Sequence, residues 1–174
     1  VYKRQVYDRL IEEGRAFDLK HCGYHALNSL RIEKGYREWA HDIGPEDTPL
    51  ESGLSFTCAW DKPGGFIGRD ALLEKRGKPF TRRLVQFILE DPEPQLFHNE
   101  PILRDGELVG MTSSAGYGHT LGAAMALGYV RNEGGVDRAF LDSGTFEIDV
   151  EDRRFAARVS LRPMYDPKNE RIRV

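Results

Sequence analysis

Residues 23–56 read GYHALNSLRIEKGYREWAHDIGPEDTPLESGLSF, and this stretch sets the organisation of the first part of the chain. Apolar residues at helical spacing predict a helix over residues 24–34, and Gly35 supplies a C-terminal stop signal. Residues 42–49 cannot continue a helix, because they contain two prolines that lack the backbone N–H. The stretch therefore predicts a helix, a turn-rich connection and a second apolar segment.

Two further helical patterns flank this stretch. Apolar residues at positions 6, 10 and 11 predict a short amphipathic helix that ends at Gly14. After the turn-rich connection, residues 56–60 predict an extended segment, Gly64-Gly65 breaks the chain, and residues 69–75 predict another short helix. The first part of the chain is therefore expected to be mixed, with helices and irregular connections.

The chain changes character after residues 76–83, which read RGKPFTRR and combine charge with Gly and Pro. Beyond this boundary, Asp105-Gly106 predicts a tight hairpin, because both residues tolerate a positive φ. Six strands are predicted, over residues 84–90, 101–104, 107–113, 125–130, 145–150 and 155–161. Short strands at this spacing predict a small barrel or sandwich.

The bulk composition excludes several classes of protein. Lys and Arg number 25 against 28 Asp and Glu, so a formal charge of −3 gives no basic field for nucleic acid or an anionic membrane. No apolar run approaches the roughly 20 residues that span a bilayer. The two cysteines, Cys22 and Cys58, form no disulfide framework, which favours a reducing compartment such as the bacterial cytoplasm or the mitochondrial matrix. The chain starts without Met inside a helical pattern, and we expect a piece of a longer polypeptide.

Six segments are more informative together than singly: LRIEKGYREW, TPLESGL and FIGRDAL in the first part, and RRLVQFILE, PILRDGELVG and ALGYV in the β part. In this order they resemble the aminomethyltransferase (glycine-cleavage T-protein) family, and within it the C-terminal region of sarcosine and dimethylglycine dehydrogenases. The resemblance implies an α+β protein. Residues 1–78 would be the second half of a folate-binding domain, and residues 79–174 a small antiparallel β-barrel.

The resemblance also implies folate-binding residues. Tyr36 and Phe56 match positions where the family places large side chains near the ligand, and Leu27 falls where the aminomethyltransferases carry an arginine. That departure removes a charge-assisted contact typically worth ~1.5–3 kcal/mol, which His25 or Arg31 could replace. The alternative for each residue is ordinary packing, because large apolar side chains are usually buried. For Leu27 we expect this alternative, with Ala26 and Leu30 on the same inner side of the helix.

No catalytic residue is assigned. The family's catalytic carboxylate and its pterin-binding glutamate belong to the first half of the folate domain, and neither motif occurs here. Glu33 follows an apolar helix face and is interpreted as a surface or packing carboxylate. We therefore expect no catalysis by this chain alone.

Flavin and metal sites are also not predicted. Residues 116–122 (GYGHTLG) have the spacing G-x-G-x-x-x-G, without the strand, helix and distal acid of a dinucleotide loop, and are interpreted as a β connection. His21 and His25 are one helical turn apart, but a closed zinc site needs four ligands. The resemblance places FAD only in a region upstream of this chain.

Three hypotheses about function remain open. The first is the C-terminal tetrahydrofolate-binding part of a sarcosine or dimethylglycine dehydrogenase-like protein, which passes the one-carbon unit of an N-methylglycine to tetrahydrofolate. The second is an aminomethyltransferase of the glycine cleavage system, and the third is a non-catalytic regulatory module. The expected partners are small-molecule folate and the upstream flavin and folate half-domains of the same polypeptide, with no nucleic acid and no membrane.

Overall fold

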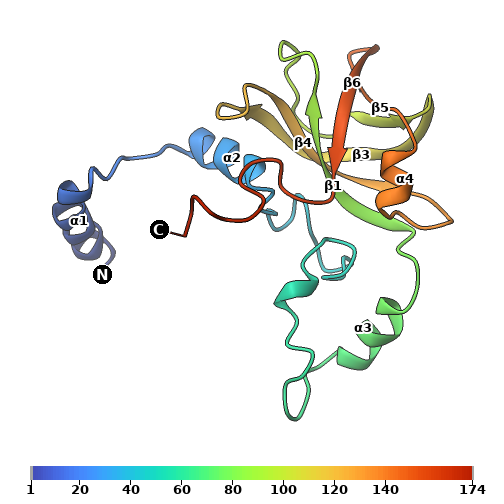
Figure 1. Cartoon of the computed structure of the whole chain (residues 1–174). Coiled ribbons are helices and arrows are strands. Elements are labelled where there is room, and N and C mark those ends of the chain that lie inside the picture. Colours follow the sequence, from blue (N-terminus) through green and yellow to red (C-terminus); the bar gives the residue numbers. More distant parts are fainter. Residues whose placement is uncertain (1, 174) are drawn as a thin grey trace.

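The computed structural model describes residues 2–173, and Figure 1 shows a β-barrel preceded by an extended segment of short helices and irregular connections. In chain order the elements are α1 (Lys3–Gly14), η1 (Arg15–Phe17), α2 (Tyr24–Glu33), η2 (Ser55–Thr57), α3 (Arg69–Arg76), β1 (Arg82–Leu89), β2 (Pro101–Arg104), β3 (Glu107–Gly118), β4 (Ala123–Arg131), α4 (Arg138–Asp142), β5 (Phe146–Val150) and β6 (Arg153–Ser160). The α+β fold class is confirmed. None of the helices within the described residues is long and apolar enough to cross a bilayer.

The six strands close into an antiparallel barrel in the order β1-β4-β3-β2-β5-β6. Each predicted strand forms, although β3 continues to Gly118, beyond its predicted end at residue 113. The extension pairs with β4 as far as Gly118 opposite Ala123, so residues 116–122 form the end of a β-hairpin. The interpretation of this glycine-rich run as a β connection is confirmed.

The Asp105-Gly106 hairpin is also confirmed. Both residues have positive φ, +52° and +87°, as a tight turn between β2 and β3 requires. The Asp105 carboxylate accepts a hydrogen bond of 2.8 Å from the backbone N–H of Thr145, which ties the turn to the start of β5. Local turn chemistry and a long-range contact therefore agree at this end of the barrel.

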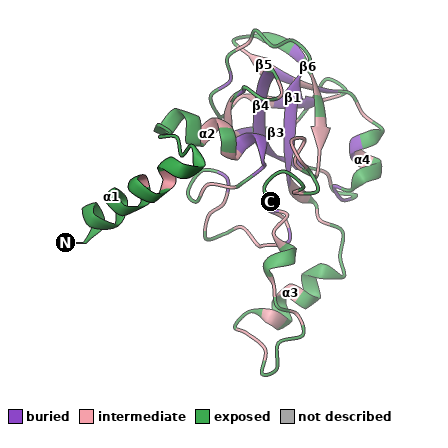
Figure 2. Ribbon diagram, turned by 60° about the vertical axis from the view of Figure 1, so that its left-hand side comes forward, coloured by how far each residue is buried: buried purple, intermediate pink, exposed green. Residues whose placement is uncertain are grey.

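The barrel encloses the main hydrophobic core, which appears as buried strands in Figure 2. Phe87, Ile102 and Ile148 are among its fully buried side chains, and Phe87 and Phe146 have ring centroids 5.9 Å apart. β1 and β4 are buried on both faces, because α2 covers part of the outer face: Ile32 packs with Ile88, Ala123 and Met125. This second cluster attaches the helical segment to the barrel.

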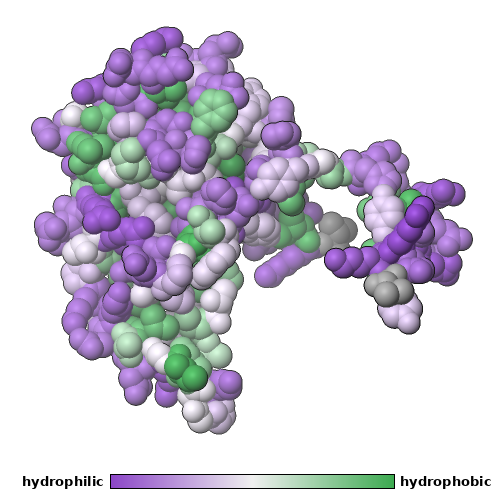
Figure 3. Space-filling view, turned by 180° about the vertical axis from the view of Figure 1, so that it is seen from behind, coloured by the Kyte–Doolittle hydropathy of each residue, from purple (hydrophilic) through white to green (hydrophobic). Residues whose placement is uncertain are grey.

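The segment before the barrel is packed much more loosely. α1 ends at Gly14 as predicted, but it has no buried residue and stands away from the barrel (Figures 1 and 3). Its apolar side chains Val6, Tyr7 and Leu10 are each more than half exposed. The predicted amphipathic helix is therefore present, while its apolar side has no cover among residues 2–173.

The predicted extended segment over residues 56–60 is wrong. Its start belongs to η2, a short turn in which the Thr57 hydroxyl donates to the carbonyl of Leu54 at 2.7 Å. The indole N–H of Trp60 donates to the carbonyl of Ser55 at 3.2 Å. Such local side-chain bonds offer the backbone an alternative to strand pairing, and no neighbouring strand competes here.

Candidate functional site

The three residues matched to folate contacts all carry exposed side chains. Leu27 on α2 is 56% exposed, Tyr36 just after α2 is 52% exposed, and Phe56 in η2 is 80% exposed. The expectation that Leu27 packs inward with Ala26 and Leu30 is wrong, because all three are exposed. The packing alternative fails for Phe56 as well within the described residues. Whether any of the three contacts folate remains a prediction.

Leu27 is exposed because the barrel covers a different side of α2. The Ser29 hydroxyl donates to the carbonyl of Tyr117 at 2.6 Å, and Ile32 and Glu33 are buried one turn later. The spacing of 3.6 residues per turn then places Leu27 on the opposite side of the helix and Leu30 on its flank. We call Tyr24, Leu27 and Leu30 the outward α2 face, and it is visibly exposed in Figure 2.

The backbone beneath Tyr36 is firmly held. Gly35 adopts the left-handed conformation with φ of +65°, and the N–H of Tyr36 donates to the carbonyl of Arg31 at 2.8 Å. A Cβ on Gly35 would lie 3.3 Å from the ring of Pro163, so the C-terminal tail packs against this turn. The Tyr36 ring is thus exposed on a fixed support, as a binding side chain should be.

The Arg31 guanidinium is engaged by partners within the chain. Its guanidinium pairs with the carboxylates of Asp42 at 2.9 Å and Glu38 at 2.7 Å, and it donates to the Ser114 hydroxyl at 3.0 Å. Asp42 is buried and also accepts a hydrogen bond of 2.5 Å from the Ser113 hydroxyl. Arg31 therefore joins α2 to the loop after it and to β3, whereas His25 is exposed on α2.

Glu33 is a buried packing carboxylate. Its oxygens accept hydrogen bonds from the N–H of Thr120 at 2.7 Å, the N–H of Leu121 at 3.0 Å and the Thr120 hydroxyl at 2.9 Å. The surface interpretation of this residue is therefore excluded. Next to it, Lys34 is buried and donates to the Asn169 side chain at 2.6 Å and to Asp166. The end of α2 thus binds both the β3–β4 connection and the C-terminal tail.

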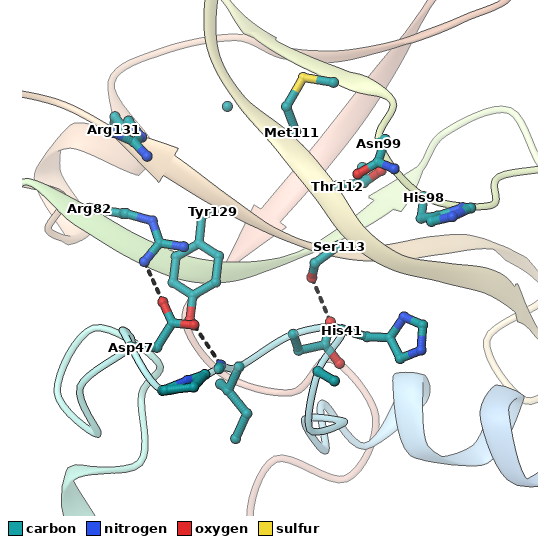
Figure 4. Close-up of a pocket in the computed structure, with 16 residues that line it drawn as sticks. His41, Asp47, Arg82, His98, Asn99, Met111, Thr112, Ser113, Tyr129 and Arg131 are labelled. Atoms are coloured by element: carbon teal, nitrogen blue, oxygen red, sulfur yellow. Dashed lines mark hydrogen bonds and ion pairs between the residues drawn. The ribbon is translucent and has the colours of Figure 1, made fainter.

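A cleft of about 740 Å³ lies between residues 40–47 and the outer face of β1, β3 and β4 (Figure 4). At one end of the cleft, the Asp42 carboxylate accepts a hydrogen bond from the Ser113 hydroxyl. At the other end the Asp47 carboxylate pairs with the Arg82 guanidinium at 2.5 Å and accepts from the N–H of Gly44 at 2.8 Å. Arg82 also stacks 3.5 Å from the centre of the Tyr129 ring.

The neighbours of Asp47 and Tyr129 set the protonation states of these two side chains in the cleft. Burial by itself would raise the pKa of Asp47, but hydrogen bonds from Arg82 and from the Gly44 N–H lower it overall. Burial raises the pKa of the Tyr129 phenol, and the adjacent negative charge of Asp47 raises it further. At neutral pH the cleft therefore holds an ionised carboxylate beside a protonated phenol.

The cleft offers binding groups and no recognisable catalytic set. His41, His98 and Arg131 line it with exposed side chains, while its two aspartates are engaged in the pairs described above. Among residues 2–173 no group of three His, Cys, Asp or Glu side chains is placed to hold a metal. His21 instead shares a hydrogen bond of 3.2 Å with the Tyr7 hydroxyl.

Sequence reasoning did not find this cleft. In the sequence, Asp42 and Asp47 are recognisable only as members of a turn-rich run. Their partners Ser113 and Arg82 lie on strands far along the chain. An arginine pair at the start of a predicted strand was the one available signal, but a charged pair there is common on solvated surfaces. Only the folded arrangement joins these residues.

Comparison with known families agrees with the two-part architecture. Residues 1–62 match the GCVT N-terminal domain, and residues 82–166 match the glycine cleavage T-protein C-terminal barrel domain. In structure, the chain resembles the glycine cleavage system aminomethyltransferase T from Bartonella henselae, with a TM-score of 0.75 over 95% of this chain and 44% of that one. At 23% identity this likeness supports the fold alone.

Curated relatives match at higher identity over nearly the whole chain. The chain is 46% identical over 97% of its length to a 4-methylaminobutanoate oxidase (formaldehyde-forming) from Paenarthrobacter nicotinovorans, covering 20% of that protein. It is 38% identical over 97% of its length to human mitochondrial sarcosine dehydrogenase, covering 18% of that protein. The chain thus spans about a fifth of the length of these relatives, and it belongs to the glycine cleavage T-protein family, as a counterpart of the C-terminal region of sarcosine and dimethylglycine dehydrogenases.

Proposed function

We propose that this chain is the tetrahydrofolate-binding C-terminal part of a sarcosine or dimethylglycine dehydrogenase-like protein. In that protein, the one-carbon unit released from an N-methylated glycine would be transferred to tetrahydrofolate. The relatives named for such substrates support this proposal, since human sarcosine dehydrogenase and human dimethylglycine dehydrogenase are 38% and 35% identical to the chain. The amine oxidation itself would belong to a flavin region upstream.

One observation carries the folate proposal: apolar and aromatic side chains are exposed on a rigid support. Leu27 and Tyr36 flank a helix end that Arg31, Glu33 and Lys34 fix to the barrel and tail through buried charges. Contiguous exposed apolar patches mark binding surfaces, and under this proposal these side chains form one patch. Stacking of a flat pterin on Tyr36, with Phe56 and Leu27 as further apolar contacts, would bury them. The upstream folate half-domain would supply the opposite wall.

The proposed boundaries are residues 1–78 for the folate half-domain and residues 79–174 for the barrel. The connection at residues 76–83 supports this division, because it carries the chain from α3 to the first barrel strand. The two parts would not be independent, since Ile32 of α2 packs with Ile88 and Met125 of the barrel. We therefore expect the barrel to need α2 for full stability.

Relatives of other classes keep two alternatives open. A probable aminomethyltransferase from Pyrococcus furiosus is 33% identical to the chain, and the mouse pyruvate dehydrogenase phosphatase regulatory subunit is 37% identical. The oxidase at 46% identity is named as formaldehyde-forming, and a protein of that kind would release the carbon unit. Folate dependence of formaldehyde release by the full-length protein discriminates among these alternatives.

The test is a pair of measurements on Tyr36→Ala. In the full-length protein, the variant should weaken tetrahydrofolate binding measured by calorimetry and leave flavin reduction by the amine substrate nearly unchanged in stopped-flow experiments. Phe97→Ala is a matched control, because Phe97 is an exposed aromatic residue of the barrel part. The 174-residue chain alone should bind a folate analogue with a Kd of roughly 0.1 mM or weaker, because half of the site is absent. Unchanged folate affinity in Tyr36→Ala would reject this site.

A further inference from the structure

The two arginines that open β1 have very different surroundings. Arg82 and Arg83 are consecutive residues of a strand, so their side chains point to opposite faces of the sheet. Arg82 pairs with Asp47 and stacks on Tyr129. Arg83 donates a single hydrogen bond, a long one of 3.5 Å to the carbonyl of Val136, and its guanidinium lies 5.6 Å from the Phe80 ring.

Arg83 is a partly buried guanidinium with five N–H donors, of which one makes that hydrogen bond and the others remain accessible to solvent. Arg104, the partly buried arginine of β2, shows the contrast: it donates to the Phe140 carbonyl, to Ser143 and to Asp105 at 2.8–3.3 Å. Burial lowers the pKa of Arg83, and the charge of Asp137 opposes that effect. The side chain remains a cation at neutral pH, so most of its donors face no acceptor among the described residues.

Arg83 lines a cleft of about 460 Å³ between α4, the start of β1 and the end of β6. Figure 1 shows these three elements side by side at one edge of the barrel. Three arginines and one aspartate line the cleft, and Leu141, Val159 and Leu161 provide its apolar wall. We call this the arginine cleft. Its volume is within the range of small-molecule sites.

The charges in the arginine cleft are only partly balanced. Arg138 pairs with Asp142 at 3.1 Å. The exposed guanidinium of Arg162 has no hydrogen bond or ion pair within residues 2–173, and the N–H of the same residue donates to the Ser160 hydroxyl oxygen at 3.1 Å. The hydroxyl hydrogen of Ser160 is then available as a donor. The cleft thus combines two guanidinium groups that carry free, solvent-accessible donors with the neutral hydroxyl donor of Ser160.

We propose that the arginine cleft binds a small oxyanion, the phosphate or carboxylate group of a small molecule, between Arg83 and Arg162. Guanidinium forks match the geometry of both groups and bind them in a bidentate way. The apolar wall would contact the uncharged part of the same ligand. The site is separate from the outward α2 face and from the cleft at Asp47, so it does not depend on folate binding.

The proposal is tested by titrating the 174-residue chain with inorganic phosphate and, separately, with acetate at constant ionic strength, followed by ¹⁵N NMR. Signals of Arg83, Ser160 and Arg162 should shift saturably. Arg162→Ala should weaken binding roughly tenfold, equivalent to about 1.4 kcal/mol. Arg83→Gln should have a similar effect. The stronger of the two anions identifies the preferred headgroup.

Arg154→Ala is the matched control, because Arg154 is an exposed arginine of β6 outside the cleft. The affinity of Arg154→Ala for either anion should equal that of the unchanged protein. If Arg83→Gln fails to fold, the affinity of Arg162→Ala is the test, because the Arg162 side chain makes no other hydrogen bond or ion pair within residues 2–173. Shifts that never saturate with either anion, or an equal loss in Arg154→Ala and Arg162→Ala, would overturn the proposal and leave only general charge attraction.

Discussion

In the barrel, Phe87, Ile102 and Ile148 are completely buried, whereas in the segment before it Leu27, Tyr36 and Phe56 keep more than half of their surface exposed. The two regions have similar apolar residues and differ in what surrounds them. Barrel strands cover each other on closure, because every strand has a neighbour on both sides. The preceding segment is covered only where α2 and residues 42–52 meet the barrel. The comparison indicates that the barrel buries its apolar side chains within itself, with α2 completing part of its outer face, whereas the segment leaves large apolar side chains uncovered within the described residues.

The two regions should respond in opposite ways to loss of an apolar side chain. Phe87→Ala should lower the free energy of unfolding by about 3–5 kcal/mol, because it opens a cavity in the barrel core. Leu27→Ala should change it by less than about 0.5 kcal/mol, because the side chain is already exposed. Urea denaturation of both variants measures the difference. A loss above about 1 kcal/mol in Leu27→Ala would show that the outward α2 face is packed in solution.

The connection between the two regions should depend on Glu33. Glu33→Ala removes the acceptor for two buried backbone N–H groups and one hydroxyl, and should destabilise the protein by about 3 kcal/mol. Glu33→Gln should lose less, since one oxygen remains. Glu74→Ala is the control, as that carboxylate lies on the exposed side of α3. Hydrogen exchange at Thr120 and Leu121 should increase in Glu33→Ala only. Unchanged exchange there would contradict the role assigned to Glu33.

A smaller, pH-dependent effect should come from Asp47, which joins the segment to β1. Its pKa is lowered in the folded state, so its stabilisation is complete above the unfolded value near 4 and is lost as the pH falls through the folded value. We expect Asp47→Asn to cost about 1 kcal/mol at pH 7 and less below pH ~4. Urea denaturation across this range tests the sign. A difference that grows on acidification would contradict it.

Much of the fold could be predicted from the sequence because its signals are local. The hairpin at Asp105-Gly106 depends on two adjacent residues, and the helix end at Gly35 depends on one turn of chain. Short apolar runs separated by turn residues located all six strands. The motifs shared with the T-protein family supplied what local signals cannot, namely that these strands close into a barrel. The residues 56–60 were misjudged because side-chain bonds within the turn outweighed an extended pattern.

The sequence by itself determined the helices α1, α2 and α3, the six strands, their order and the family, whereas α4 was not predicted. The tertiary structure decided which side of α2 is covered, where the Glu33 carboxylate is buried and which of two adjacent arginines has a partner. Each of these depends on residues distant in sequence: Glu33 meets Thr120, and Arg82 meets Asp47 while Arg83 faces the arginine cleft. Periodicity fixes which residues share a face, but it carries no information about what that face will meet. Burial and charge pairing, and with them the candidate binding surfaces, arise only when the barrel closes and α2 docks against it.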